Sequence, residues 1–200
     1  MQATIANTNI KIIIVGGRSA DDHEDNGPKL YIMELAPKFI EKKLYKTGAH
    51  VITKQYQRYL PQAKTLNMLP SYLIYREAKA ADAYDALLYD TDGQLHEGTR
   101  TNVFAIKDKT LMTPPDDMVL PGVTRKTVIE CAETNGFEVK KEHIKMDKLV
   151  QFDGVFLTGT SPKILPVTSI DNQKLNEIPP ALQELMKLYN TFVRQRGEII

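Results

Sequence analysis

Glu97-Gly98-Thr99-Arg100-Thr101-Asn102-Val103-Phe104 sets a carboxylate, a glycine and an amide directly before an apolar run. Upstream, Lys64 lies within Gln62-Ala-Lys-Thr-Leu-Asn67. Two loops rich in glycine and threonine follow, Leu120-Pro-Gly-Val-Thr-Arg125 and Thr158-Gly-Thr-Ser161. Any one of these segments is common. Their occurrence together, in this order, indicates that they serve one site.

The surrounding pattern predicts a mixed fold of strands and helices. Runs rich in β-branched residues indicate strands, and a period near 3.6 residues indicates helices. We expect strands at 10–15, 29–33, 50–53, 86–89, 94–97, 102–106, 110–112, 137–139, 154–157 and 164–168, and helices at 38–45, 70–83, 123–135 and 180–194. The first strand is expected to be buried, Thr124 to cap its helix, and Pro166 to take an edge or bulged position.

Bulk composition narrows the function classes. The chain has 200 residues with 42% apolar and 26% charged residues, enough for one full domain plus part of another. A net charge of +1 gives no reason to expect nucleic acid or an anionic membrane as a partner. Cys131 is the only cysteine and is expected on the buried face of a helix, and the four histidines lack metal-ligand spacing. With no secretory signal pattern and no apolar run long enough to span a bilayer, we expect a cytoplasmic protein.

The types of residue in the four segments suit pyridoxal 5′-phosphate. An amine can form a Schiff base, a carboxylate can hold the proton of the pyridine nitrogen, and the two loops can bind phosphate. A lone lysine is usually a solvated surface amine, but Lys64 lies between Leu60 and the apolar run 66–69. That surrounding favours loss of the ammonium proton. Taken alone, a glutamate after a strand such as Glu97 is most often a surface charge. Gly98, which follows it, allows the backbone to turn sharply.

The two loops admit simpler interpretations as well. Residues 120–125 precede a helix whose first free N–H groups form an anion site, although a plain helix cap would look the same. Residues 158–161 offer hydroxyls after a strand, which is a frequent arrangement. Asn102 is expected to fix the intervening loop through side-chain to backbone hydrogen bonds.

The four segments resemble those of the class IV aminotransferases, the fold-type IV pyridoxal-phosphate enzymes. This family includes branched-chain aminotransferase, D-amino-acid aminotransferase and aminodeoxychorismate lyase. The resemblance spans about residues 10–170. It rests on Lys-x-x-Asn at Lys64, Glu-Gly-x-x-x-Asn-Val-Phe at Glu97, Leu-Pro-Gly-Val-Thr-Arg at Leu120 and Phe-Leu-Thr-Gly-Thr-Ser at Phe156.

The fold implied by this resemblance is α+β. It has a large domain like that of D-amino-acid aminotransferase, with a β-meander or pseudo-barrel and helices, preceded by part of a small α/β domain. We expect residues 1–61 to form the partial N-terminal domain and residues 62–200 the large pyridoxal-phosphate-binding domain. The resemblance also implies a homodimer.

Residue roles follow from the same resemblance. Lys64 would carry the cofactor and move the substrate proton, Glu97 would bind the pyridine nitrogen, and Leu120 would pack on the ring. The phosphate and the substrate carboxylate would be held by residues of the two loops. Val123, Thr124 and Thr160 are expected at the phosphate, and Thr160 with Ser161 at the carboxylate.

Departures from the family leave several functions open. The N-terminal part is short, and neither Arg18 nor Arg58 is an obvious replacement for the family's phosphate-binding arginine. Met68 stands where branched-chain enzymes often have tyrosine, and in this respect residues 64–69 are more similar to the D-amino-acid enzymes. The Asn-Arg-Leu that the lyase often has is missing from 67–69. The leading hypothesis is a transaminase acting on a small, branched-chain amino acid and a 2-oxo acid. The alternatives are D-amino-acid transamination, the lyase reaction, or a non-catalytic relative that lost activity with its N-terminal half.

Overall fold

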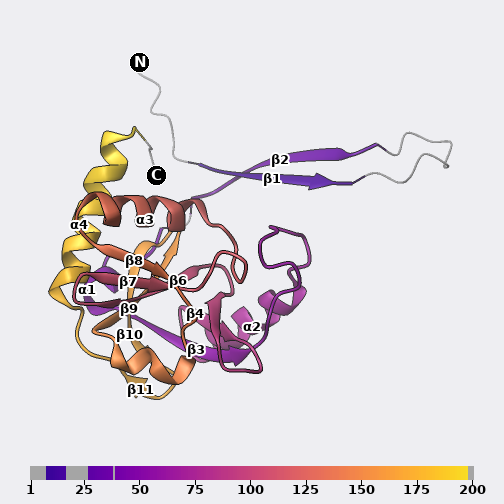
Figure 1. Ribbon diagram of the computed structural model, residues 1–200. Coiled ribbons are helices and arrows are strands. Elements are labelled where there is room, and N and C mark those ends of the chain that lie inside the picture. Colours follow the sequence, from indigo (N-terminus) through magenta and orange to yellow (C-terminus); the bar gives the residue numbers. More distant parts are fainter. Residues whose placement is uncertain (1–7, 17–26, 38, 198–200) are drawn as a thin grey trace. The chain divides into compact units, whose positions relative to one another are not determined.

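The computed structural model describes residues 8–16, 27–37 and 39–197, which form two compact units divided after Phe39 (Figure 1). The first unit contains strands β1 (Asn9–Val15) and β2 (Lys29–Leu35), paired antiparallel from Asn9 opposite Leu35 to Val15 opposite Lys29. The expectation that the first strand is buried is wrong. In the described part of this unit β1 has only β2 as a sheet neighbour, and most of its apolar side chains are exposed.

The second unit begins before the domain boundary predicted from the sequence. Strand β3 (Ala49–Gln55) pairs in parallel with both β4 (Asp85–Tyr89) and β10 (Lys163–Ile170). The predicted boundary after residue 61 therefore falls inside the second compact unit.

A single mixed sheet organises this second unit. Its nine strands run in the order β5-β4-β3-β10-β9-β6-β7-β8, with β11 added beside β10. The remaining strands are β5 (Leu95–Gly98), β6 (Asn102–Lys107), β7 (Thr110–Thr113), β8 (Glu138–Lys141), β9 (Gly154–Gly159) and β11 (Gln173–Lys174). The sheet curls until its two ends meet. This closure is seen in the hydrogen bond that the Leu95 amide of β5 donates to the carbonyl of Ile144, just beyond β8, at 2.7 Å. This is the expected pseudo-barrel.

Helices and a short 3-10 segment complete the unit. They are α1 (Leu44–Thr47), α2 (Leu69–Ala80), α3 (Val123–Thr134) and α4 (Pro180–Gln195), with the 3-10 turn Met146–Gln151. One apolar core fills the concave side of the sheet and includes Leu87, Val103 and Leu157. A second lies between the sheet and helices α3 and α4, where Phe104 stacks on Phe156 with ring centroids 5.0 Å apart. A third lies under α2.

Two local expectations need correction. The helix predicted at 38–45 is reduced to Leu44–Thr47, and Lys38 lies outside the described residues. Leu44 and Tyr45 pack on the concave core whereas Phe39 is exposed, so only the packed part is helical. Pro166 lies in an interior strand, so the edge position is wrong, whereas the bulged alternative agrees with a register shift directly after it, between Val167 and Ser169. Pro166 tolerates this place because the pairing of β10 with β3 starts only at Val167 and is irregular before Ser169.

Candidate active site

The second unit contains a pocket of about 500 Å³ that brings most of the predicted residues together. Its lining includes six of the seven predicted site residues: Lys64, Glu97, Leu120, Val123, Thr124 and Thr160. Ser161 is exposed in the turn after β9 and does not line it. Four segments far apart in the sequence thus meet at one cavity.

Glu97 lines this pocket from a buried strand, which we call the Glu97 end. It lies on β5, and its residue is only 4% exposed. Its Oε1 accepts a hydrogen bond from Arg58 Nε at 2.6 Å, and its Oε2 accepts one from the Leu120 amide at 3.1 Å. Burial raises the pKa of the Glu97 carboxyl, and the charge of Arg58 acts in the opposite direction. The site therefore contains a carboxylate that is both desolvated and fixed in orientation.

A fully buried carboxyl group supports the loop after Glu97. Asp85 accepts hydrogen bonds from the hydroxyls of Thr99 and Thr101, the latter at 2.8 Å. A Cβ at position 98 would clash with Thr101 Oγ1 and would lie 2.7 Å from Asp85 Oδ2. Gly98 is thus required for this close approach, whereas the sequence suggested a sharp turn. Burial raises the pKa of Asp85, and the threonine hydrogen bonds oppose that shift.

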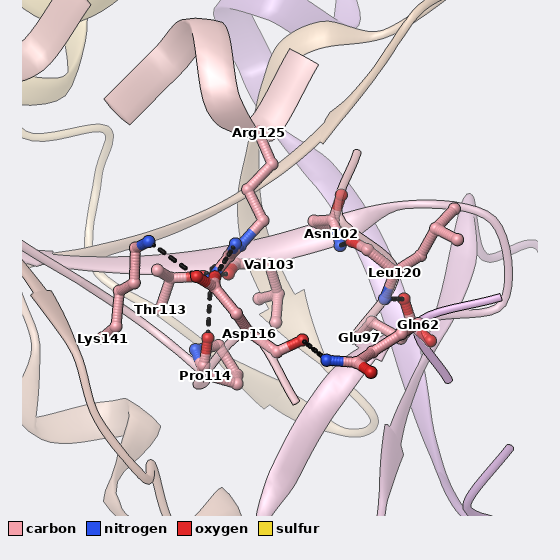
Figure 2. A network of polar contacts seen from close by, with 10 residues as sticks. All are labelled: Gln62, Glu97, Asn102, Val103, Thr113, Pro114, Asp116, Leu120, Arg125 and Lys141. Carbon is pink, nitrogen blue, oxygen red and sulfur yellow. Dashed lines mark hydrogen bonds and ion pairs between the residues drawn. The ribbon is translucent and has the colours of Figure 1, made fainter. Parts of the chain in front are cut away.

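Residues 113–122 tie the Glu97 end to helix α3, as Figure 2 shows. Arg125, in the first turn of α3, donates to Asp116 Oδ1 at 2.5 Å and to the Pro114 carbonyl at 2.7 Å. Lys141 holds the other carboxylate oxygen of Asp116 at 2.8 Å. Near the end of the segment, the Asn102 side chain donates to the Leu120 carbonyl at 2.8 Å. Asn102 therefore fixes a loop through a side-chain to backbone hydrogen bond, as predicted. The loop that it fixes is residues 113–122, however, and not the expected one between Glu97 and Asn102.

The N-terminus of α3 presents unpaired backbone amides to the pocket. The N-cap is Gly122, and a Cβ there would clash with Asn102 Oδ1. The amides of Val123, Thr124 and Arg125 donate no hydrogen bond to another residue in the described part of the chain. The expectation that Thr124 caps the helix is wrong, because it lies inside the first turn, where its hydroxyl is available to a ligand.

Lys64 lines the same pocket from an exposed segment, which we call the Lys64 end. Its side chain is exposed, as are Leu60, Leu66 and Met68. The apolar surrounding expected for this lysine is therefore absent from the second unit as described. The segment between β3 and α2 is irregular, and side chains of Arg58 and Gln62 hold it through hydrogen bonds to Glu97 and to the Asp116 carbonyl.

Other candidate groups contribute little to a site. Within the described ranges, no cluster of three or more His, Cys, Asp or Glu side chains is arranged to hold a metal ion. None of the helices placed there has the length and apolar character needed to cross a membrane. Cys131 is buried on α3 as expected, and burial raises the pKa of its thiol.

The sequence did not predict Arg58 or Asp85 as parts of the site. Arg58 was considered only as a phosphate ligand, but its guanidinium contacts Glu97 and the Pro61 carbonyl. The sequence offers one hint: Arg58 lies only six residues before Lys64, so if Lys64 lines the pocket, Arg58 is expected to lie near it. Asp85 gives a weaker signal, as the polar first residue of an apolar strand.

Comparison with known families agrees with this geometry. The family model for amino-transferase class IV matches residues 2–170. The chain belongs to this family. A class IV aminotransferase has the fold inferred from the sequence motifs, and the expected α+β, fold-type IV architecture is confirmed.

Individual relatives carry related names. The chain is 43% identical over 123 residues to the "Probable branched-chain-amino-acid aminotransferase" of Rickettsia felis, covering 60% of this chain and 42% of that protein. It is 35% identical over 141 residues to the D-alanine aminotransferase of Bacillus licheniformis, covering 70% and 50%. The chain spans half or less of the length of these curated relatives.

A solved structure shows the same fold. The branched-chain amino acid aminotransferase of T.th. with pyridoxamine 5′-phosphate superposes with a TM-score of 0.77 and 28% identity. The match covers 88% of this chain and 60% of that one.

Proposed function

We propose that this class IV aminotransferase uses pyridoxal 5′-phosphate to move an amino group between a small amino acid and a 2-oxo acid. One observation carries the proposal: an amine, a buried carboxylate and a free helix N-terminus line one pocket of about 500 Å³. The donor set fits the cofactor, since α3 offers unpaired amides to a phosphate and Glu97 offers a fixed carboxylate to a pyridine nitrogen.

Each end of the pocket has its own task. When bound, the cofactor stores the electrons released at the substrate's α-carbon. Lys64 would hold it through Nζ and would then move a proton at that carbon. Glu97 would keep a proton on the pyridine nitrogen through a carboxylate oxygen, and Leu120 would pack on the ring.

The loops would bind the charged groups of cofactor and substrate. Val123 and Thr124 would bind phosphate through amides of the α3 N-terminus, and Thr160 would add its hydroxyl. We assign the substrate carboxylate to Thr160 and Ser161. Ser161 does not itself line the pocket but follows Thr160 in the same exposed turn after β9.

A branched-chain amino acid is the leading substrate proposal. Its support is the naming of relatives such as the Rickettsia felis protein and the T.th. enzyme. The Bacillus licheniformis relative, named D-alanine aminotransferase, supports D-amino-acid transamination as the second candidate. The exposed Lys64 segment supports a non-catalytic relative as a third.

Cofactor attachment is the first test. Purified protein mixed with pyridoxal 5′-phosphate should turn yellow, and borohydride followed by peptide mapping should place the reduced adduct on Lys64. Lys64→Ala should lose the adduct, whereas Lys79→Ala, at an exposed lysine outside the pocket, should keep it. A colourless protein with no adduct would contradict the proposal.

Half-reactions then separate the candidate activities. L-leucine, D-alanine and aminodeoxychorismate should be tested with the coloured protein, and L-leucine should convert the cofactor fastest. Faster conversion with D-alanine or aminodeoxychorismate would replace the branched-chain assignment. Colour without any conversion would favour the non-catalytic relative.

We also propose that the protein is a cytoplasmic homodimer. Seven exposed apolar side chains lie on one segment beside the pocket: Tyr59, Leu60, Leu66, Met68, Leu69, Tyr72 and Leu73. Exposed apolar surface of this kind marks association sites. Sedimentation should give twice the monomer mass, and a monomer at micromolar concentration would contradict the assignment.

A further inference from the structure

The contact between Arg58 and Glu97 is the closest ion pair at the pocket. Arg58 Nη2 lies 2.5 Å from Glu97 Oε1, and Arg58 Nε donates to the same oxygen at 2.6 Å. The Glu97 side chain is 5% exposed and that of Arg58 18%. In the described part of the chain, no cationic side chain other than Arg58 lies within ion-pair distance of Glu97.

Arg58 also contacts the segment that leads to Lys64. Its Nη2 donates to the Pro61 carbonyl at 2.6 Å, and the Ala63 amide closes the next turn on the Leu60 carbonyl at 2.9 Å. One guanidinium thus joins the carboxylate of β5 to the chain just before Lys64. A second, exposed contact reaches the same segment, because Gln62 Nε2 donates to the Asp116 carbonyl at 3.2 Å, but it touches neither Glu97 nor the Pro61 carbonyl (Figure 2).

The charge of Arg58 matters because Glu97 is desolvated. Burial raises the pKa of Glu97, and Arg58, followed by the Leu120 amide, counteracts this shift. A carboxyl group that took up a proton would no longer hold a proton on a pyridine nitrogen. The guanidinium therefore favours the protonation state that the carboxylate needs.

We propose that Arg58 is a positioning residue that keeps Glu97 ionised and oriented and, through the Pro61 carbonyl, fixes the Lys64 segment relative to it. This inference rests on the proposed function, because the positioned groups are those assigned to the cofactor. It also removes Arg58 as a candidate phosphate ligand in this arrangement, since its guanidinium already contacts Glu97 and Pro61.

The test compares Arg58→Met, Arg58→Lys and a matched control in the full chain. Arg196→Met removes another arginine–glutamate pair, in which Arg196 contacts both Glu130 oxygens at 2.7 and 2.8 Å outside the pocket. Without cofactor, the Glu97 carboxyl is titrated by carbon-13 NMR and assigned with Glu97→Gln. The pKa of Glu97 should rise in Arg58→Met, rise less in Arg58→Lys, and stay unchanged in Arg196→Met.

Two further readouts follow the positions of the groups. Hydrogen exchange of amides 59–67 should be faster in Arg58→Met than in the wild type, while exchange in β5 should change little. Pyridoxal 5′-phosphate affinity should fall by about tenfold or more in Arg58→Met, as expected for the loss of a hydrogen bond to a charged group, and partly recover in Arg58→Lys.

The outcomes distinguish this inference from the function beneath it. Unchanged titration and exchange in a folded Arg58→Met, or in Arg58→Lys if the first variant does not fold, would overturn the role of Arg58. A wild-type protein that binds no cofactor would overturn the proposed function instead, because the titration and exchange are measured without it.

Discussion

At one end of the pocket Glu97 is buried and held by Arg58 and the Leu120 amide, whereas at the other end Lys64 lies on an exposed segment. The Glu97 end is part of the folded sheet, so its geometry is maintained by the same contacts that stabilise the unit. The Lys64 end is an irregular segment whose apolar side chains are exposed. The difference predicts that changes at the Glu97 end alter stability, and that changes at the Lys64 end alter chemistry alone.

Lys64→Ala is expected to show the largest difference between an effect on the reaction rate and an effect on stability. Loss of a group that transfers a proton lowers rates by about 10²–10⁴-fold, and loss of cofactor attachment adds to this. Because Lys64 is exposed, the free energy of unfolding should change by no more than about 0.5 kcal/mol. Transamination assays with urea denaturation measure both quantities. An active variant, or a strongly destabilised one, would break the comparison.

This asymmetry also explains what the sequence could predict. Short motifs at strand ends and helix starts predicted that Glu97, Leu120 and Val123 lie at one site, and all three line the same pocket. The Arg58–Glu97 pair could not be predicted. It joins residues 39 positions apart and depends on the path of an irregular segment.

Burial was the other limit on the sequence prediction. Apolar composition predicted an apolar surrounding for Lys64 and a buried first strand. Composition alone cannot show whether another layer of the fold packs against such a segment. Both segments proved exposed in the described structure. Where periodicity coincided with a packed face, as in α4 with Leu182, Leu185 and Tyr189, the prediction was confirmed.

The second-largest effect is expected inside the core behind Glu97. Leu87 is fully buried and lies opposite Gly98 in the pairing of β4 with β5. Leu87→Ala should lower the free energy of unfolding by about 2–5 kcal/mol, because it leaves a cavity in packed apolar surroundings. Denaturant titration gives the value. A loss below about 1 kcal/mol would mean that this end is not rigidly packed.

Arg125→Met should have an intermediate effect on the segment that carries the Leu120 amide. It removes the bonds to Asp116 and the Pro114 carbonyl, but Asp116 is half-exposed and keeps Lys141. The loss of stability should be about 1–3 kcal/mol, and cofactor affinity should fall with it. The control Lys141→Ala removes a partly exposed ion pair to the same carboxylate and should cost less than about 1 kcal/mol. Equal losses in both variants would contradict the anchoring role of Arg125.

A smaller, pH-dependent difference is expected at Asp85. Burial raises its pKa in the folded protein above the unfolded value of about 3.9, so the folded state keeps the proton that the unfolded chain loses. The stability from this carboxyl is complete below about pH 4 and is lost as pH rises through the folded pKa. Asp85→Asn removes this dependence. Its stability relative to the wild type should therefore improve as the pH rises above about 4, and a difference that stays constant with pH would contradict the assignment.

The smallest effect is expected from Leu66→Ala, the counterpart of Leu87→Ala at the Lys64 end. Leu66 is 59% exposed in the single chain, so at a protein concentration low enough to dissociate the proposed dimer its truncation leaves no cavity and should change the free energy of unfolding by less than about 0.5 kcal/mol. The measurement should be repeated at several protein concentrations. A cost near 2 kcal/mol that grows with concentration would show that a second copy covers Leu66. In that case a second copy buries the Lys64 end in the dimer, and the difference in burial between the two ends exists only in the isolated chain.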